Sequence, residues 1–527
     1  MNVVSELDRM AAQNGDGPAV CTPFGDRSYR TLSFRRLGEK IDGTAHILKE
    51  RGVQKGSRVL LLVPPGEKLL WASFALLKMG AVPIVIDPGM GIKDFLAGVR
   101  RSVPQFLLAP SRILWLSHLF YRTFGNIRRI NVGDFEKPFP RTPPFPTVSL
   151  EEHETAAILF TSGSTGYPKG VCYTHRHFYA QLKSLRDVFP IEPGEVDFPL
   201  LPIFSLFDPA LGMTTVVPRM EARKPAQLDP AKAVEDLRRF RVTNSFGSPR
   251  LWSKIVDYAE KQGCVFPSLK RVLVAGAPAS PQLLKRVQDR VVSGEVYTPY
   301  GATEALPLTL ISAREVLEET LGRTVKGHGT CVGKPLPGVE IRILPDGAFS
   351  VKNPLGPFEV GEIVVSGPVV TERYDGIPTA DKTHKIWMEG VCWHRMGDVG
   401  YMDDRGRLWF CGRRVERVVS GQDVWYTECC EPIFNTHPNV FRSALIGLVD
   451  GDKRIPAIVV EPLRFPFGCQ KRRAFVEELR VLAAKHQTTR AIEHFFFHTS
   501  FPVDVRHNAK IHRLKLARYF SKKFLPG

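Results

Sequence analysis

Ile158-Leu-Phe-Thr-Ser-Gly-Ser-Thr-Gly-Tyr-Pro-Lys-Gly170 is the stretch on which the fold and the chemistry of this chain depend. Its first three residues are apolar and typical of the end of a buried strand. They run directly into a loop of Thr, Ser and Gly. Glycine tolerates the positive φ angles of a concave loop, so backbone N–H groups and hydroxyls can converge on one point. An oxyanion such as phosphate would fit there, and Lys169 would add a positive charge.

The loop by itself leaves two interpretations open. It does not have the spacing of the P-loop, in which four residues separate the first Gly from a Gly-Lys pair. Short Ser/Gly turns are also common in surface loops. From this stretch alone, a phosphate site and an ordinary turn are equally well supported.

The composition indicates a soluble, multidomain protein. The chain has 527 residues, enough for two to four domains with a large core. Its apolar content of 43% and charged content of 24% are ordinary for a globular protein. No apolar run reaches the ~20 residues of a membrane-spanning helix, and residues 1–9 lack the features of a signal peptide. The nine cysteines include no CxxC pair, which fits reduced thiols in the cytoplasm better than disulfides or a zinc site.

The chain is strongly basic, with a formal net charge of +18. Residues 464–527 contain fourteen Lys and Arg against four Asp and Glu, so this tail carries +10 of the total. Such a balance favours contact with polyanions: nucleotides, nucleic acid or an anionic membrane surface. A generally basic soluble surface explains it equally well. Because no zinc-finger or RNP pattern is present, we do not expect nucleic acid as a partner.

Strand and helix patterns alternate through about the first 300 residues. Residues 31–52 combine a Thr/Ser cap with the apolar spacing of an amphipathic helix. Residues 59–63 form an apolar run closed by two prolines, as in a buried parallel strand. The alternation predicts an α/β fold with stacked, largely parallel sheets.

The pattern changes from about Val339 onward. Shorter alternating segments with Gly- and Asp-rich turns predict a β-rich subdomain that completes the large domain. Residues 443–449 then indicate a strand and residues 474–485 a helix, which together suggest a small α+β unit. The Pro-rich residues 455–466 between them are predicted to form a loop.

One segment, Ile113-Leu-Trp-Leu-Ser-His-Leu-Phe-Tyr121, interrupts the alternation. Arginines lie on both sides of its aromatic and aliphatic residues. This pattern is typical of a helix that lies in a membrane interface. The same residues could form a core helix with one solvated end, and the sequence leaves both interpretations open.

Four further stretches carry candidate functional groups. Val272-Leu-Val-Ala-Gly-Ala-Pro278 is a predicted strand that ends in small residues, where a flat ring could lie against the backbone. Tyr300-Gly-Ala-Thr-Glu304 combines an aromatic face, a hydroxyl and a carboxylate. Residues 397–406 form an acidic, turn-rich segment that Gly412-Arg413 closes, and residues 504–513 lie near the C-terminus. Each of these alone could be a surface loop.

Taken together and in this order, the five stretches closely resemble the AMP-forming adenylating superfamily of acyl-CoA synthetases, luciferases and peptide synthetase adenylation domains. The resemblance extends from about Leu32 to Leu516. It implies a large N-terminal AMP-binding domain, residues 1–413, and a small α+β C-terminal lid, residues 414–527. In that family the lid turns between two poses, and the hinge would lie near residues 413–416.

The resemblance also implies ATP and Mg²⁺ as cofactors and assigns roles to single residues. The β- and γ-phosphates would be held beside Lys169 by the loop residues Thr161, Ser162, Gly163, Ser164, Thr165 and Gly166. The AMP moiety would be bound by Gly276, Ala277, Tyr300, Gly301, Ala302, Asp398 and Arg413, with Tyr300 at adenine and Asp398 and Arg413 at ribose.

Three residues would carry the catalytic roles. Thr303 would bind phosphate, and Glu304 would hold the Mg²⁺ that bridges phosphate oxygens. Lys510 would be the lid cation that closes on the reacting groups. A carboxylate that attacks the α-phosphate approaches a polyanion, so a point cation delivered at closure would stabilise the transition state.

Departures from the usual acyl-CoA synthetase pattern narrow the function. Ser205 stands where a His is usual, Val415 replaces an Asp or Lys of the hinge, and Cys430 replaces an acidic residue. In these respects the chain resembles the β-lactone synthetases of bacterial long-chain olefin biosynthesis. That family adenylates a long-chain β-hydroxy acid, whose own hydroxyl displaces AMP.

The resemblance therefore predicts a β-lactone synthetase that acts on a long-chain β-hydroxy fatty acid. A long-chain fatty acyl-CoA synthetase is the main alternative. An amino-acid adenylation domain would need an acidic anchor for the ammonium group, and Asp208 is its one candidate. We expect a cytoplasmic enzyme that contacts an anionic membrane surface at its inner face, or other enzymes of a hydrocarbon pathway.

Overall fold

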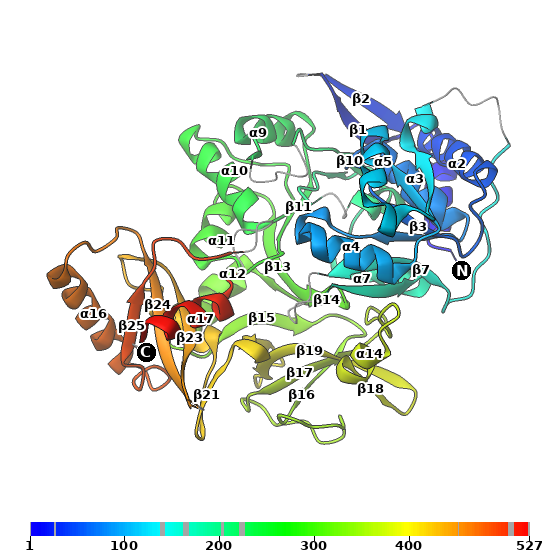
Figure 1. The fold of residues 1–527 in the computed structure, drawn as a ribbon. Coiled ribbons are helices and arrows are strands. Elements are labelled where there is room, and N and C mark those ends of the chain that lie inside the picture. Colours follow the sequence, from blue (N-terminus) through cyan, green and yellow to red (C-terminus); the bar gives the residue numbers. More distant parts are fainter. Residues whose placement is uncertain are drawn as a thin grey trace.

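The computed structural model describes residues 2–25, 28–136, 143–161, 168–201, 205–220, 227–451, 453–503 and 511–524. These residues form a fourteen-stranded sheet, a six-stranded sheet, and smaller three- and two-stranded sheets, with helices packed against them (Figure 1). The predicted α/β class is therefore confirmed.

The six-stranded sheet positions the Ser/Gly loop. Its strands are parallel up to the last one, β8, in the order β6 (Arg128–Asn131), β5 (Phe106–Ala109), β3 (Arg58–Leu61), β4 (Val82–Val85), β7 (Thr155–Thr161) and β8 (Lys169–Thr174). The loop thus connects two antiparallel neighbours, and Thr161 lies opposite Lys169. The run at residues 59–63 is β3, as predicted.

Helices pack around this sheet. They are α1 (Val4–Gln13), α2 (Phe34–Glu50), α3 (Glu67–Lys78), α4 (Ile92–Ser102) and α7 (His175–Val188). The predicted helix at residues 31–52 is α2. It begins after Ser33, whose hydroxyl accepts a hydrogen bond from the Arg36 N–H and so satisfies a free donor of the first turn.

The fourteen-stranded sheet changes from parallel to antiparallel at its middle. The parallel strands are β1 (Pro18–Phe24), β10 (Thr214–Val216), β9 (Val196–Asp197), β11 (Asn244–Gly247), β12 (Arg271–Val274) and β13 (Glu295–Ala302). The antiparallel strands are β2 (Ser28–Ser33) at one edge and, beyond β13, β14 (Ala305–Ser312), β15 (Thr330–Pro335), β20 (Leu408–Arg413), β19 (Val391–Met402), β17 (Gly361–Ser366) and β16 (Glu340–Leu344), with β18 (Lys385–Met388) beside β19. The β-rich texture expected after residue 339 is found in β16 to β20, whereas the antiparallel half begins earlier, with β14 and β15.

Three helices that pack on the parallel half begin with the same pair of residue types. A capping Asp or Ser precedes a Pro at the first helical position, as the fixed φ of proline favours. These helices are α9 (Pro230–Arg239), α10 (Pro249–Lys261) and α11 (Pro281–Gln288). They pack with the strands around the fully buried Trp252 and Phe266.

The C-terminal part forms its own sheet, of β23 (Val440–Asp450), β24 (Lys453–Pro462) and β25 (His494–Phe497). Its helices are α15 (Thr427–Phe434), α16 (Cys469–Ala484) and α17 (Arg513–Phe524). In Figure 1 this unit lies on the opposite side of the molecule from the six-stranded sheet. The prediction of a loop over residues 455–466 was wrong for residues 455–462, which belong to β24. Pro456 lies opposite Gly447 in a ladder that continues on both sides of it.

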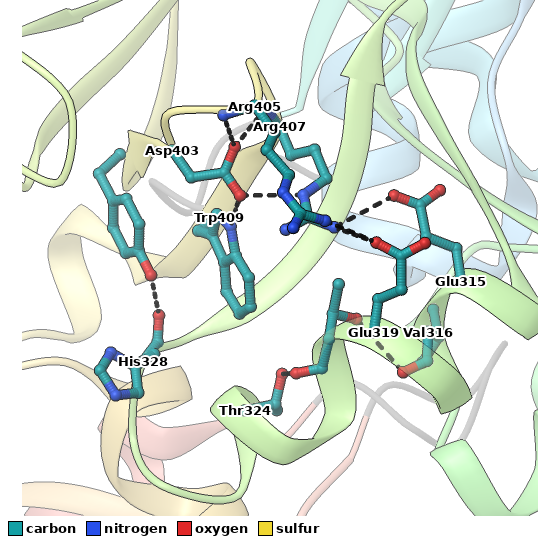
Figure 2. Close-up of polar contacts among 11 residues, drawn as sticks. Glu315, Val316, Glu319, Thr324, His328, Asp403, Arg405, Arg407 and Trp409 are labelled. Carbon is teal, nitrogen blue, oxygen red and sulfur yellow. Dashed lines mark hydrogen bonds and ion pairs between the residues drawn. The ribbon is translucent and has the colours of Figure 1, made fainter.

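The β19–β20 hairpin is anchored at its turn by a buried polar cluster (Figure 2). Asp403 Oδ2 accepts hydrogen bonds from Arg407 Nε and Trp409 Nε1, both at 2.9 Å. Arg407 Nη1 also lies 3.0 Å from Glu319 Oε2 on the neighbouring helical segment of residues 313–324. Asp403 is therefore a structural residue that fixes the hairpin to the body of the protein.

The segment at residues 113–121 spans α5 (Ser111–Ser117) and a short turn before α6 (Tyr121–Phe124). Only its inner residues, Ile113 and Leu114, pack on the core. Its outer face is apolar and solvent-exposed, with exposed fractions of 66% for Trp115, 67% for Leu119 and 72% for Tyr121. The core-helix interpretation therefore describes Ile113 and Leu114, and the exposed outer face is the solvated part of the segment. Among the described residues, every helix is too short or too polar to cross a bilayer.

Asp197, the last residue of β9, and Asp208 form a pair of buried carboxyl groups. Asp197 and Asp208 are hydrogen-bonded to each other, and Asp208 also accepts a hydrogen bond of 2.8 Å from the Thr215 hydroxyl. Burial raises the pKa of both groups, and their mutual repulsion adds to the shift of Asp197. Asp208 is thus buried and engaged with core groups, which argues against its use as an anchor for a substrate ammonium group.

This pair predicts a pH-dependent stability. A carboxyl whose pKa is raised by folding keeps its proton in the native state after the unfolded chain has released it, so the free energy of unfolding falls as the pH rises above about 4. Asp208→Asn removes one titrating group but keeps an acceptor for Thr215. We expect the variant to melt at a higher temperature than the wild type at pH 8, and the difference to shrink toward pH 4.5. Asp16→Asn, at a highly exposed site, is the matched control. If the difference in melting temperature between Asp208→Asn and the wild type stays constant with pH, the interpretation that folding raises the pKa of this pair is contradicted.

Candidate active site

The candidate site is built on the turn of the β13–β14 hairpin. Ala302 and Ala305 pair across the hairpin, so Thr303 and Glu304 form its two-residue turn. The Thr303 carbonyl accepts a hydrogen bond of 2.5 Å from the Tyr173 hydroxyl. The Glu304 carbonyl accepts hydrogen bonds of 2.9 Å from both the N–H and the hydroxyl of Thr371. These bonds fix the backbone of the turn without using its two side chains.

On one side of the hairpin, Tyr300, Asp398 and Arg413 come together. The Tyr300 hydroxyl donates to Asp398 Oδ2 at 2.6 Å, and Arg413 Nη1 lies 3.1 Å from Asp398 Oδ1. Strand pairing explains the second contact, because Asp398 on β19 lies opposite Arg413 on β20. Burial and the nearby carboxylate raise the pKa of Tyr300, and the charge of Asp398 raises that of Arg413. The phenol therefore stays protonated and the guanidinium stays charged.

Glu304 and Lys169 both contact Tyr374. Glu304 Oε1 accepts a hydrogen bond of 2.9 Å from the hydroxyl of Tyr374. Lys169 Nζ lies 5.4 Å from the centre of the Tyr374 ring and 2.8 Å from His384 Nε2. Burial lowers the pKa of Lys169, and the charge of Glu304 opposes that shift.

Residues 371–385 supply three side chains that the sequence patterns did not predict: Tyr374, His384 and Lys385. Tyr374 precedes α14 (Pro378–His384), and Asp381 of that helix holds the Tyr374 N–H at 2.7 Å. The buried Lys385 donates to the Thr371 carbonyl, and burial lowers its pKa to about 8. No motif marks these residues in the sequence, since their role depends on the position of α14 beside β8.

The small residues lie where a flat ligand could approach the backbone. Gly276 and Ala277 follow the end of β12, which pairs with β13, the strand that carries Tyr300. Gly276 has a φ of +87°, which favours glycine. At Gly301, a Cβ atom would lie 2.7 Å from the Ala305 carbonyl oxygen, so only glycine fits without movement of the hairpin.

Several predicted site residues lie outside the described residues. These are Ser162, Gly163, Ser164, Thr165, Gly166 and Lys510. Of Thr161 the backbone alone is described, as the last residue of β7. The described residue nearest to Lys510 with a clear anchor is Arg513. Its guanidinium makes two hydrogen bonds of 2.6 Å to Glu431 and one of 3.0 Å to Glu416.

Glu304 has the carboxylate of a magnesium ligand, but it is not part of a larger group of metal-binding side chains among the described residues. In the described part of the chain, no three His, Cys, Asp or Glu side chains gather as a metal-binding group. Mg²⁺ commonly uses one or two protein carboxylates and completes its octahedron with water and substrate phosphates. A single carboxylate at the tip of a fixed turn fits that use, so Glu304 is suited to hold Mg²⁺ together with a phosphorylated ligand.

Comparison with known proteins supports an adenylating site. Residues 7–375 match the family model of the AMP-binding enzymes. The chain is 38% identical to an olefin beta-lactone synthetase of Stenotrophomonas maltophilia, over 99% of this chain and 98% of that protein. It is equally similar to an olefin beta-lactone synthetase of Xanthomonas campestris, over 98% and 97%. A feruloyl-CoA synthase of Amycolatopsis is 27% identical over 80% of the chain.

Solved structures share the fold. An amide bond synthetase from Marinactinospora thermotolerans superposes with a TM-score of 0.80 at 22% identity, over 99% of this chain and 100% of that one. An O-succinylbenzoate coenzyme A synthetase from Bacillus subtilis, solved with ATP and magnesium, gives 0.77 at 22% identity, over 97% and 98%. At this identity the likeness concerns the fold.

Proposed function

This chain belongs to the AMP-binding enzyme family, and on that premise we propose that it activates a long-chain β-hydroxy acid with ATP and closes it to a β-lactone. It is an AMP-forming ligase. The observation that carries the proposal is the 38% identity to two olefin beta-lactone synthetases over nearly the full length of each. The match to an acyl-CoA-forming relative is weaker and shorter, at 27% over 80% of the chain.

The first step would use the two groups on either side of the β13–β14 hairpin. Asp398 would accept hydrogen bonds from the ribose hydroxyls, and Tyr300 would pack on adenine. Glu304 would hold Mg²⁺ on the phosphates. Lys169 and the loop of residues 161–166 would also bind the phosphates and stabilise their negative charge. A substrate carboxylate oxygen would bond to the α-phosphorus, and pyrophosphate would leave. Lys510, on a lid of residues 414–527, would stabilise the charge of that transition state.

In the second step the substrate would supply its own nucleophile. The β-hydroxyl oxygen would bond to the acyl carbon, AMP would leave, and the hydroxyl proton would be released. An internal nucleophile held near the carbonyl has an effective concentration far above that of a free thiol. The acyl-adenylate is a mixed anhydride whose free energy can drive closure of a strained four-membered ring. Replacement of the usual His by Ser205 is consistent with an acceptor other than CoA.

The product distinguishes the two candidate functions. With ATP, Mg²⁺ and a long-chain β-hydroxy acid, the enzyme is expected to release AMP and a β-lactone in the absence of CoA. A plain fatty acid of the same length offers no hydroxyl, so it should yield only the adenylate or its slow hydrolysis. Rapid quenching and mass spectrometry measure both products. Lys510→Ala, expected to lose adenylation ~10²-fold or more, controls for contaminating activities. A CoA thioester as the main product, formed only when CoA is added, would establish the acyl-CoA synthetase function instead.

Substitutions around Glu304 test the metal site. Glu304→Gln should raise the Mg²⁺ concentration needed for half-maximal activity by roughly tenfold or more, because a neutral amide is a poorer ligand for a hard cation. Tyr374→Phe keeps the ring but removes the hydrogen bond to Glu304, so a smaller shift in the same direction is expected. Magnesium titrations of pyrophosphate release provide the measurement. Unchanged titrations in Glu304→Gln would place the metal on other ligands.

The exposed face at residues 115–121 fits a lipid surface, on which a long-chain substrate is concentrated. Trp115 on α5 and Leu119 in the turn that follows it are both highly exposed. Between Asp94 and Asp134 the chain has six arginines and no acidic residue. Interfacial helices combine aromatic and aliphatic side chains with basic residues in this way. We propose that this face docks on an anionic bilayer, and that the enzyme is peripheral to the membrane.

Vesicle binding tests the docking face. The wild type is expected to co-sediment with vesicles that contain anionic lipid, less with neutral vesicles, and less at high salt. Trp115→Ser with Leu119→Ser should abolish most of this binding, because the apolar contact is lost. Phe349→Ser removes an even more exposed aromatic residue, 92% exposed, from another region and is the matched control. The assignment would be overturned if Phe349→Ser lost as much vesicle binding as the double variant. It would also be overturned if the wild type bound neutral and anionic vesicles equally.

A further inference from the structure

Lys169 is held by an uncharged partner. Its ammonium lies 2.8 Å from His384 Nε2, at the end of α14 and just before β18. The Tyr374 ring, whose centre is 5.4 Å from the ammonium, and the His384 ring meet edge to face with centres 5.9 Å apart. The lysine that follows the Ser/Gly loop therefore contacts two residues more than 200 positions away in the chain.

The hydrogen bond has a defined direction. An ammonium group has donors only, so Nε2 of His384 must be the acceptor and the ring proton must be on Nδ1. The surroundings favour an uncharged ring, since burial lowers the pKa of His384 to about 4, with Lys169 and Lys385 adding to the shift. The nearby His394, whose Nδ1 lies 3.2 Å from the His384 carbonyl, is also kept uncharged by burial.

We infer that His384 is a positioning residue that presents Lys169 to the phosphates of the nucleotide. This inference rests on the proposed function of the loop. Lysine has a long, flexible side chain, and its ammonium is a point charge without the rigid geometry of arginine. A fixed acceptor selects one orientation of that side chain before the nucleotide arrives. A charge that is already oriented needs no rearrangement when the nucleotide binds or when the reaction occurs. The contact between His384 and Lys169 therefore favours both nucleotide binding and the chemical step.

The neutrality of the acceptor is the specific feature of this arrangement. A carboxylate at the same position would also orient the ammonium, but it would neutralise the charge and repel the phosphates. Glu304 is already close enough to raise the pKa of Lys169, and a second anion would compete further with the nucleotide. A neutral imidazole orients the lysine and leaves its full positive charge for the ligand.

Three substitutions at one position separate orientation, charge and structure. His384→Ala removes the acceptor and should raise the KM for ATP roughly tenfold, the effect of one hydrogen bond to a charged group, with a smaller change in kcat. His384→Gln supplies a neutral acceptor and should restore the KM to near the wild-type value. His384→Glu supplies a charged acceptor and should bind ATP more weakly than His384→Gln. His153→Ala, at an exposed site, is the control, and thermal melting verifies that each variant is folded.

A double-mutant cycle tests the route of the effect. In a Lys169→Ala background, His384→Ala should produce no further change in the KM for ATP, because the group that it positions is gone. Additive effects would show that His384 acts by another route and would overturn the inference. So would equal KM values for all three His384 variants. A direct measurement of MgATP binding by the wild type separates the role of His384 from the proposed function. If the wild type does not bind MgATP, the proposed function itself is rejected.

Discussion

The hydrogen bond between the Tyr300 hydroxyl and the Asp398 carboxylate joins the two hairpins on which the candidate site is built. Tyr300 belongs to β13, the last parallel strand of the large sheet, and Asp398 belongs to β19 in its antiparallel half. A carboxylate this deeply buried is stable only when its oxygens have partners. Arg413 forms an ion pair of 3.1 Å with the other oxygen, so the three residues link the parallel and antiparallel halves of the sheet beside the turn that carries Glu304.

The features predictable from the sequence were those with local causes. The helix at residues 34–50 follows from a Ser cap and the spacing of its apolar side chains, and β3 from a short apolar run closed by prolines. Tyr300, Asp398 and Arg413 were assigned to one site because their motifs resemble those of the AMP-forming adenylating superfamily, and the structure brings their side chains together. The β-rich character of the chain after residue 339 also followed from the strand pattern, but the parallel-to-antiparallel change lies earlier, between β13 and β14.

The features that could not be predicted depend on contacts between distant segments. His384 and Tyr374 have no distinctive neighbours in sequence, and they become part of the site only because α14 packs beside β8. Pro456 argues against a strand by itself, yet tertiary pairing with β23 places it within one. The apolar face around Trp115 was ambiguous because a sequence pattern does not reveal whether another element covers it.

The first strand of the large sheet, β1, pairs with a strand that is formed much later in the chain, and this has a consequence for synthesis of the protein on the ribosome. β1 has β2 as a local neighbour, but its partner within the sheet is β10, and the hydrogen bond from Thr214 to the Pro18 carbonyl spans 196 positions. At roughly 5–20 residues per second, the apolar strand β1 waits on the order of 10 to 40 s for that partner to be translated. During this interval an unpaired strand edge is accessible to other nascent chains. The first hairpin of the protein therefore exposes an unpaired edge until β10 has been synthesised.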